Sequence, residues 1–385
     1  MKTTTFIKIA TLIIFSLIIT SCDNNTHIPE ANTSPIRTIN LKIAGTLENQ
    51  LGEHYKSVTG LEITGVINGD DIHTIHQMPE LQKLDISEAT IVNGGTYNYN
   101  NKAVAALENT ITEGMFYKLE QIESISLPKS ITKIESDAFR ECLSLGSIAI
   151  PDGVTAIGDN AFDGCTCINS IKLPNSVTTI GNSSFKNCNS LNFIDLPENL
   201  TSLGNNALEG CSNIDRVFIP NGITEVKEYT FKGCTDLIYV SIPNSVIKIK
   251  SGAFWECTNL IGILIQNGTT EIEDGAFYKC TLLRMIEIPD SVTTIGGEST
   301  GTFNGCTYLG YVIIGSGINT IYRNSFDDCI DLREIHINAT TPPKVVGENG
   351  GITNKSEVTL FVPKGKKEVY QNNSDWQGFK EYIEL

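Results

Sequence analysis

The stretch from Ile148 to Phe193 decides the fold, because it states one pattern twice in succession. Residues Ile148 to Ser170 read "IAIPDGVTAIGDNAFDGCTCINS", and the residues up to Phe193 read "IKLPNSVTTIGNSSFKNCNSLNF". The same pattern continues on both sides with a step of 23 residues, which the prolines mark at Pro128, Pro151, Pro174, Pro197, Pro220 and Pro243. A fixed period of about 20 to 50 residues is typical of a solenoid, in which each repeat forms one coil.

Nine such units follow one another from Ile125 to the strand at 333–338. Eight are 23 residues long, and the unit that begins at Ile286 has 26 because three extra residues precede Phe303. Each unit contains a short strand with two aliphatic residues in alternation, a proline turn, a second aliphatic pair and an A-F-x-x-C turn that we expect to be helical. The repeat therefore predicts an α/β solenoid with a parallel sheet on one face and short helical or irregular turns on the other, capped at both ends.

Stacking of the units places equivalent residues above one another. The phenylalanine of the turn is then expected to form one buried column, in which Leu208 replaces it in a single unit and marks a possible weak point. No unit can bury its own apolar side, so only the stack is stable. The column comprises Phe116, Phe139, Phe162, Phe185, Phe231, Phe254, Phe277, Phe303 and Phe326.

Nine of the 11 cysteines hold one place in the repeat, three residues after the phenylalanine position. Leu119 holds that place in the incomplete unit upstream, which indicates an apolar packing position, and a free cysteine packs as a small hydrophobe. Disulfides are the alternative for an exported chain, but like positions in stacked coils carry parallel Cβ vectors that do not suit a bridge. The predicted structural thiols are Cys142, Cys165, Cys188, Cys211, Cys234, Cys257, Cys280, Cys306 and Cys329.

Residues 1–21 have the features of an export signal. Lys2 and Lys8 precede a short apolar run, and Cys22 follows an aliphatic residue and two small ones. This resembles a bacterial lipobox and implies cleavage before Cys22 and lipidation of its thiol; the alternative is a plain secreted protein with a chance cysteine. Residues 22–40 are rich in Asn, Thr and Pro and are expected to form a flexible stalk.

The ends of the array depart from the strict period. Residues 41–110 are expected to form an N-terminal cap with atypical leucine-rich repeats, a helix around residues 70–78 that Asp70 or Asp71 caps, and a surface loop inserted at 92–109. Residues 111–338 form the predicted solenoid. Residues 339–385 are expected to be a C-terminal cap with a strand at 358–362, a short helix carrying Tyr370, and Trp376 closing the last coil.

The outward strand positions change character along the chain. They are small or charged as far as Lys172, but from Phe193 onward they are largely apolar or aromatic, and we expect them to form a continuous stripe on the sheet. Exposed apolar patches with aromatics and Met usually mark partner sites; the alternative is that these residues simply suit strands. The candidate partner-binding residues are Phe193, Phe218, Tyr239, Leu264, Met285, Tyr311 and Ile313.

Signs of other function classes are few. The net charge is −16, and Lys and Arg are not clustered. Because phosphate binding needs clustered positive charge, the chain is not expected to bind nucleic acid. We expect no C-x-x-C metal pair, no G-x-S-x-G nucleophile elbow, no phosphate-binding loop and no H-E-x-x-H pair, and the five histidines lack partners at ligand spacing. We therefore predict no enzymatic activity, no catalytic residue, no metal and no cofactor.

The repeat I-x-I-P-x-S-V-T-x-I-G-x-x-A-F-x-x-C-x-x-L closely resembles the BspA-like leucine-rich repeat, also called the Treponema pallidum type. The resemblance covers roughly Val58 to the C-terminus. It implies a right-handed superhelix and a surface-exposed bacterial protein of a family in which several members are linked to adhesion, host-matrix binding or co-aggregation. It brings no catalytic residues.

Two functions follow from this resemblance and the exterior. The first is a protein anchored at the cell surface, in the outer membrane, that binds a protein or peptide partner, possibly in host matrix or on other cells. The second is a passive structural or accessory lipoprotein in a larger envelope complex. In both, the lipid on Cys22 is the only membrane attachment.

Overall fold

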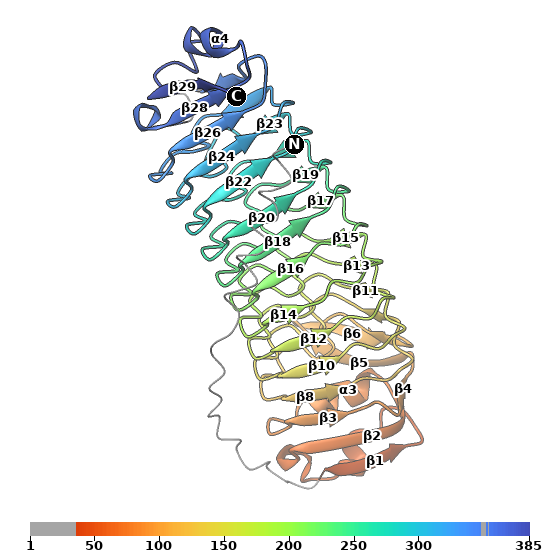
Figure 1. Cartoon of the computed structure of the whole chain (residues 1–385). Helices are drawn as coiled ribbons and strands as arrows, with labels where there is room; N and C mark the ends of the chain where they lie inside the picture. Colours follow the sequence, from red (N-terminus) through yellow and green to blue (C-terminus); the bar gives the residue numbers. More distant parts are fainter. Residues whose placement is uncertain (1–35, 348–351, 353) are drawn as a thin grey trace, which may run out of the picture. The chain divides into compact units, whose positions relative to one another are not determined.

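The computed structural model describes residues 36–347, 352 and 354–385. The predicted signal peptide, Cys22 and most of the predicted stalk lie outside the described residues. The stalk also ends earlier than expected, because Arg37–Leu41 forms strand β1 and pairs with the next strand. The described chain is a parallel β-solenoid of about 15 coils with little helix, which confirms the predicted fold class (Figure 1).

The first ladder of strands forms one face of the solenoid, and every hydrogen-bonded pair in it is parallel. Its strands are β1 (Arg37–Leu41), β2 (Gly60–Ile67), β3 (Lys83–Asp85), β8 (Ser124–Ser126), β10 (Ser147–Ala149), β12 (Ser170–Lys172), β14 (Phe193–Ile194), β16 (Arg216–Phe218), β18 (Tyr239–Ile242), β20 (Gly262–Ile265), β22 (Met285–Ile288), β24 (Tyr311–Ile314), β26 (Glu334–Ile337), β28 (Thr359–Val362) and β29 (Glu381–Glu384). Between β8 and β20 its hydrogen-bonded pairs keep the 23-residue step, so that Ile148 pairs with Ile171.

A second parallel ladder, which the sequence did not predict, is built from the second aliphatic pair of each unit. Most of its strands have two residues, such as Ala156 and the buried Ile157, and two residues are too few to show an alternating pattern. Its strands are β7 (Thr110–Ile111), β9 (Lys133–Ile134), β11 (Ala156–Ile157), β13 (Thr179–Ile180), β15 (Ser202–Leu203), β17 (Glu225–Val226), β19 (Lys248–Ile249), β21 (Glu271–Ile272), β23 (Thr294–Ile295), β25 (Thr320–Tyr322) and β27 (Lys344–Val346).

The A-F-x-x-C segment is an irregular double turn, so the helical expectation for it was wrong. Asp137 directly before this segment and Glu141 within it have φ of 56° and 58°, a left-handed conformation that a right-handed helix excludes. The backbone instead bonds to the next coil: the Phe139 N–H donates to the Ala161 carbonyl at 2.8 Å. Asn, Asp and Gly recur at the left-handed positions of other coils because they tolerate positive φ.

The phenylalanines of these turns lie in one buried column. Neighbouring rings are close to parallel with centroids 5.0 to 5.3 Å apart, as for Phe139 and Phe162 or Phe254 and Phe277. Rings at this separation gain contact energy beyond the area they bury. The column therefore binds each coil to the next from the inside.

The cysteines form a second buried column with a polar role of its own. Each thiol donates to the carbonyl of the aromatic position one coil earlier, as Cys142 does to Phe116 at 3.1 Å and Cys165 to Phe139 at 3.0 Å. All ten cysteines of the described residues are free, and only Cys167 is exposed. A thiol is small, apolar and a weak donor, so it fills the space and satisfies the carbonyl as well.

Both ladders are interrupted between the same two coils. The first ladder stops at β14 and resumes at β16, and the second stops at β15 and resumes at β17. We call this junction the seam. Leu208 is the residue that breaks the phenylalanine column here, so the seam coincides with the weak point expected from the sequence. The first ladder alone is interrupted again between β20 and β22.

The turn side holds the seam together. The Leu208 N–H still donates to the Thr230 carbonyl at 2.9 Å. The Glu209 carboxylate binds Lys186 at 2.8 Å on one side and Lys232 at 3.2 Å on the other. Burial disfavours the charged carboxylate, but hydrogen bonds from Lys186, Asn206 and Lys232 outweigh burial and lower the pKa of Glu209.

The three extra residues of the long unit are absorbed by one carboxylate of the preceding coil. Asp274 accepts hydrogen bonds from the backbone N–H groups of Thr300 at 2.9 Å and Gly301 at 2.9 Å. The insertion bulges at this turn, and Phe303 stays in its column, 5.3 Å from Phe277.

The first coils are closed by two helices and a hairpin. Helix α3 (Gly69–His76) has Asn68 as its N-cap, not Asp70 or Asp71 as expected; the Asp71 carboxylate completes the capping box. The predicted surface loop at 92–109 is instead a hairpin of β5 (Gly94–Tyr99) and β6 (Lys102–Ala106) with Tyr97 buried. The other elements at this end are α2 (Leu47–Leu51), a 3-10 turn at Tyr55–Ser57 and β4 (Ala89–Ile91).

The last coil is covered by the C-terminal segment. It contains a 3-10 turn at Lys355–Glu357 and helix α4 (Lys367–Gln371). Trp376 is buried and its indole N–H donates to the Pro343 carbonyl at 2.8 Å, while the Tyr370 hydroxyl donates to the Ala339 carbonyl at 2.8 Å. The hydrogen bonds of both side chains therefore attach the C-terminal segment to the last coil. Within the part of the chain that the structure describes, no helix is long and apolar enough to cross a membrane.

Truncation of one ring in the column should destabilise the array. Phe254 is fully buried between Phe231 and Phe277, so Phe254→Ala should lower the free energy of unfolding by about 3 to 5 kcal/mol. In a chain of nearest neighbours the lost amide protection should be confined to adjoining coils, which hydrogen exchange measures. The half-exposed Phe193 is the matched control, and Phe193→Ala should change stability by no more than about 0.5 kcal/mol. Equal losses in the two variants would contradict the buried column.

The cysteine column should resist alkylation. Burial raises the pKa of Cys142 to about 12 and raises that of Cys257 and Cys280 well above the usual range. Because the thiolate is the nucleophile, iodoacetamide near the free-thiol pKa of about 8.5 should modify only Cys167 among the described cysteines of the native protein. In denaturant all ten should react, which mass spectrometry of peptides measures. Protection of any pair after denaturation without reductant would instead indicate a disulfide.

Candidate functional site

The first ladder presents two outward positions in each strand. The first precedes the inward aliphatic residue and the second follows it, as Arg216 and Phe218 flank the buried Val217. In the early strands these positions hold small or polar residues, for example Ser147 and Ala149. The later strands carry the apolar residues that the sequence singled out.

Four of the seven predicted partner-binding residues are well exposed. The exposed fractions are 47% for Phe193, 56% for Phe218, 49% for Leu264 and 45% for Met285. The other three, Tyr239, Tyr311 and Ile313, are half-buried. Side chains of this size left open to solvent lose the free energy that burial would provide, so a partner that covers them gains it.

The register shows that these residues do not form the continuous stripe expected from the sequence. Phe193, Tyr239, Met285 and Tyr311 hold the first outward position of their strands, whereas Phe218, Leu264 and Ile313 hold the second. Successive strands from β14 to β22 therefore carry their apolar side chain at alternating positions, and β24 carries one at both. We call this set of seven residues the apolar zigzag.

The positions between the apolar residues are small or polar. Ser241 lies between Phe218 and Leu264 in the second column, and Gly262 lies next to Tyr239 in the first. A Cβ at Gly262 would meet only the Tyr239 ring, at 3.6 Å, so the space above this glycine is open. The zigzag thus has gaps as well as projections.

The aromatic surface continues past the residues predicted. His336 follows Ile313 in the second column, and its ring stacks on Phe361 with centroids 4.0 Å apart and on Tyr311 at 4.7 Å. Phe361 lies in β28, beyond the strict period, which is why the sequence did not assign it. Its outward place could have been read from the alternation in Thr359–Val362.

The charges around the late part of the zigzag are mixed, because the exposed Arg284 and Arg333 directly precede strands β22 and β26, which carry acidic residues. Glu287 is exposed beside Met285, and Glu334 lies 3.1 Å from the His336 ring nitrogen. Burial, and after it the charges of Glu334 and Glu287, raises the pKa of Tyr311, so its hydroxyl stays protonated and able to donate.

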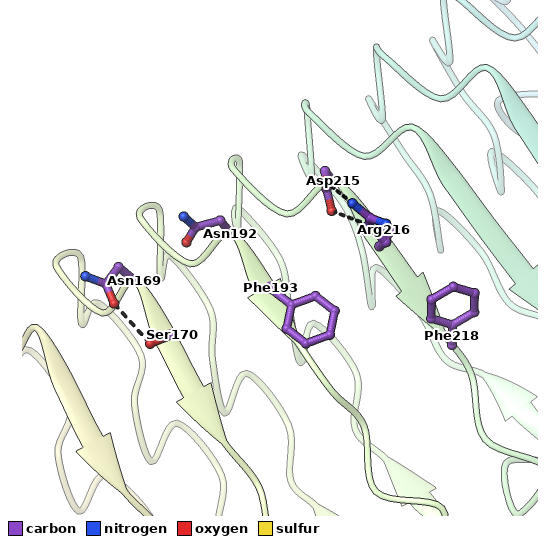
Figure 2. A pocket seen from close by; sticks show the side chains of 7 residues that line it. All are labelled: Asn169, Ser170, Asn192, Phe193, Asp215, Arg216 and Phe218. Carbon is purple, nitrogen blue, oxygen red and sulfur yellow. Dashed lines mark hydrogen bonds and ion pairs between the residues drawn. The ribbon is translucent and has the colours of Figure 1, made fainter. Parts of the chain in front are cut away.

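A shallow cleft of about 570 Å³ opens at the early end of the zigzag, where the first ladder is interrupted. Figure 2 shows Phe193 and Phe218 on one side of it and Asn169, Asn192 and Asp215 in a row along the starts of the strands. Asp215 and Arg216 neutralise each other with contacts of 3.1 and 3.2 Å. The cleft therefore joins two aromatic rings to a polar edge.

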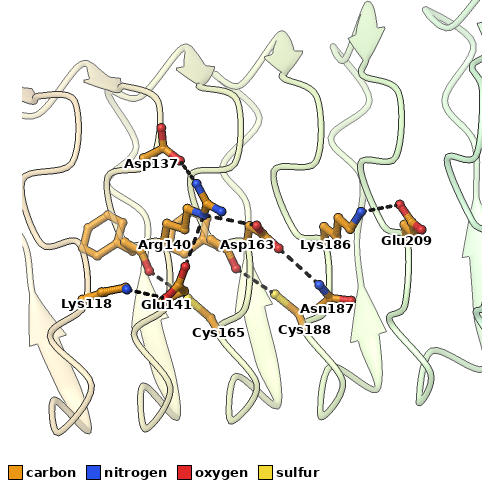
Figure 3. A network of polar contacts seen from close by, with 12 residues as sticks. Lys118, Asp137, Arg140, Glu141, Asp163, Cys165, Lys186, Asn187, Cys188 and Glu209 are labelled. Atoms are coloured by element: carbon orange, nitrogen blue, oxygen red, sulfur yellow. Dashed lines mark hydrogen bonds and ion pairs between the residues drawn. The ribbon is translucent and has the colours of Figure 1, made fainter. Parts of the chain in front are cut away.

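The turn side carries a network of charges that belongs to the fold. Arg140 lies 3.3 Å from Asp137 in its own turn and 3.3 Å from Asp163 in the next, and Lys118 pairs with Glu141 (Figure 3). These charges are paired from coil to coil, so they hold neighbouring turns together.

Three aromatic side chains on the turn side pack against one another and against lysines of the same chain. Trp255 packs on Tyr278 with centroids 4.0 Å apart and on Tyr229 at 6.3 Å. Lys232 and Lys279 lie over the two tyrosine rings at 5.4 and 5.1 Å. The faces of the tyrosine rings are thus covered by the chain's own lysines.

Although no G-x-S-x-G elbow was expected, the segment Gly297–Gly301 matches the letters of that motif. A nucleophile elbow needs a strand-to-helix turn, but Ser299 lies on the inserted turn and donates its hydroxyl to Asp274. Among the described residues, no three His, Cys, Asp or Glu side chains meet as a metal site requires. A second cleft of about 410 Å³, on the second ladder, is lined by the glycines Gly158, Gly181 and Gly204 together with polar side chains.

Comparison with solved structures gives matches to bacterial leucine-rich repeat proteins. One from Bacteroides ovatus has a TM-score of 0.50 at 23% identity, over 75% of this chain and 90% of that one. A leucine-rich cell surface protein from Faecalibacterium prausnitzii has a TM-score of 0.42 at 23% identity, over 82% and 85%. The leucine-rich repeat protein of T. pallidum has a TM-score of 0.37 at 30% identity, over 39% and 71%.

No curated protein matches the chain. The family described as the BspA type leucine rich repeat region matches residues 109–238 and 224–343 in six copies, which together span more than half of the chain. These are the units whose ladders and buried columns are described above. The chain therefore belongs to the BspA type leucine-rich repeat family.

Proposed function

We propose that this chain is an interaction protein of the bacterial cell surface that binds a protein or peptide partner through the apolar zigzag. The observation that carries the proposal is the exposure of Phe193, Phe218, Leu264 and Met285 on one face of the solenoid. Aromatic residues and Met are enriched where proteins meet, and exposed patches of this kind mark such sites.

The early half of the same face supports this assignment by contrast. Its outward positions carry Ser124, Ser147 and Ser170 in the same column that later holds Phe193 and Tyr239. If strand propensity alone selected the apolar residues, the early strands would need them equally. The difference between the early and late strands of one ladder therefore favours a binding role for the late outward residues over strand propensity.

Export and lipidation at Cys22 complete the proposal. The lipid would hold the chain at the outer membrane, and a solenoid that presents a binding face on such an anchor is suited to adhesion to host matrix or to other cells. The alternative, an accessory lipoprotein within an envelope complex, uses the same anchor and differs in where its partner resides.

Removal of three projections should abolish partner binding. Phe218→Ser, Tyr239→Ser and Tyr311→Ser combined should weaken binding of the full-length protein, in detergent solution, by more than tenfold to the matrix or bacterial-surface fraction that the unaltered protein binds. Surface plasmon resonance measures the affinity. The control changes Ile247, Tyr308 and Ile330 to Ser, because these large residues are exposed but lie off this face. Equal loss in both triple variants, or none in the first, would refute the site.

Substitution of Cys22 should release the protein from the membrane. Cys22→Ser removes the only acyl acceptor that the lipobox resemblance assigns, so incorporation of labelled palmitate should be lost. Fractionation of the producing bacterium should show the change from membrane to soluble fractions. Cys167→Ser, at the exposed cysteine, should leave incorporation unchanged. Digestion of intact cells with a protease then distinguishes an outward body from one retained inside the envelope.

A further inference from the structure

We propose that the seam is a hinge at which the two halves of the solenoid, residues 36–215 and the described residues from 216 onward, bend relative to each other. The turns on the two sides of the seam form its pivot, and the two ladder faces open and close about them. This inference does not depend on the proposed function. It rests on where hydrogen bonds cross the seam, where they are missing and where the clefts lie.

The ladder faces of the seam lack the bonds that join other coils. The Gly204 N–H donates to the Ile180 carbonyl at 2.9 Å. In the same way, the Lys250 N–H donates to the Val226 carbonyl at 2.9 Å. Lys227 holds the equivalent place at the seam, but among the described residues its N–H donates to no carbonyl one coil earlier. Hydrogen bonds are directional, so their loss on both ladder faces removes the groups that fix the angle between the two coils.

Apolar contacts hold the two halves together without fixing that angle. Leu203 and Val226 occupy equivalent places on the two sides of the seam, and both are buried. The same is true of Ile194 and Val217. The hydrophobic effect is non-directional and follows the area removed from water, so a small rotation of one half against the other keeps most of it. We therefore expect the halves to bend and not to separate.

The turns supply the pivot, because the hydrogen bonds that cross the seam are found there. The Gly210 N–H donates to the Lys232 carbonyl at 2.7 Å. The Cys234 thiol donates to the Leu208 carbonyl at 3.2 Å. The ion pair of Glu209 and Lys232 belongs to the same turns. These bonds join the turns of the two coils, so the ladder faces can open about them.

The proline turns touch across the seam. A Cβ at Gly222 would lie 2.3 Å from the Leu200 carbonyl oxygen, so the two backbones are already in close contact there. Such a contact resists further closing but does not resist opening. The described conformation is therefore the closed end of the motion.

Both clefts described above cross the seam. On the first ladder, Asn192 and Phe193 line the cleft from the early half and Phe218 lines it from the late half (Figure 2). On the second ladder, Gly204 lies on one side and Lys227 on the other. Open space on both ladder faces of one junction is what a hinge with its pivot in the turns requires.

The second interruption of the first ladder shows what a rigid junction retains. Between β20 and β22 the second ladder continues, with Ile272 paired with Ile295. Phe277 and Phe303 stack there with centroids 5.3 Å apart. At the seam the second ladder is interrupted as well, and Leu208 breaks the column of rings. Because each coil of a solenoid contacts only its neighbours, contacts elsewhere in the array do not compensate for a weak junction.

A hinge at the seam controls the width of the first cleft. Phe193 and Phe218 belong to different halves, so opening of the ladder face separates the two rings. A group that binds both rings in one state shifts the equilibrium toward that state. The early end of the apolar zigzag is then adjustable, whereas the paired strands from β22 to β28 keep their spacing.

Double electron–electron resonance between two nitroxide labels tests the hinge, because it reports the distribution of distances in a frozen sample. The background is the full-length chain with Cys22→Ser and Cys167→Ser, in which the buried cysteines should take up no label. A label at Gly262→Cys is shared by two pairs. Its partner is Ser147→Cys in the first pair and Glu381→Cys in the second.

The two pairs are matched. Each spans five coils in the same outward column, or about 24 Å at about 4.8 Å per strand. The first pair crosses the seam, whereas the second crosses only the interruption between β20 and β22. The comparison uses the widths of the distributions and not their means. We expect the distribution of the first pair to be at least twofold wider than that of the second.

A third pair tests the position of the pivot. Leu143→Cys and Thr258→Cys also span five coils across the seam, in the column that contains Ser212. The Ser212 carbonyl accepts the Asp236 N–H across the seam at 2.9 Å, so this column lies in the bonded region. The distribution of the third pair should be as narrow as that of the second. Equal widths for the first and second pairs, or a third pair as wide as the first, would overturn the proposed hinge.

Hydrogen exchange on the unlabelled chain covers the case in which a label disturbs the fold. The Lys227 amide should exchange at least tenfold faster than the equivalent Lys250 amide, because the ladder face at the seam is open. The amides of Leu208 and Gly210, which donate across the seam at the pivot, should stay protected. Equal protection of Lys227 and Lys250 would contradict the hinge.

Discussion

Register between coils is the constraint on which the rest of this structure depends. Outside the interruptions, the coils of the regular array bond to one another through backbone hydrogen bonds of the two strand ladders and of the turns, mostly with a step of 23 residues. That step brings Phe above Phe and each thiol to the carbonyl of the previous coil. A coil out of step would lose the ring contacts, the thiol bonds and the ladder bonds together, so packing and hydrogen bonding select the same alignment.

The same constraint divides the chain into an interior that cannot vary and an exterior that can. The residues that stack inside must repeat, whereas an outward residue touches only its neighbours on the face and is free to differ. In such a fold, binding specificity therefore depends on the outward residues that differ between otherwise equivalent strands. The contrast between Ser147 and Tyr239, which hold equivalent positions, is one example.

Much of this could be predicted from the sequence, because the period states which residues share a place. The phenylalanine and cysteine columns and the outward residues follow from it directly. The second ladder did not, since strands such as Ala156–Ile157 are too short for a pattern. The hairpin was hidden by a Gly- and Asn-rich composition typical of loops, although Tyr97 is buried. The alternation of the zigzag needed the register, and Phe361 lay past the point where the period ends.

The turn that Asp274 holds has a consequence for how this chain can change in evolution. A gene duplication that copies one whole unit adds a coil whose two faces match those of its neighbours, so the array lengthens without repacking. Small errors in such copying would ordinarily shift everything downstream. Here a carboxylate of the preceding coil accepts the extra backbone N–H groups at the surface, and the next aromatic ring stays in place. A repeat unit that is duplicated with a small insertion can thus be kept without disturbing the buried columns.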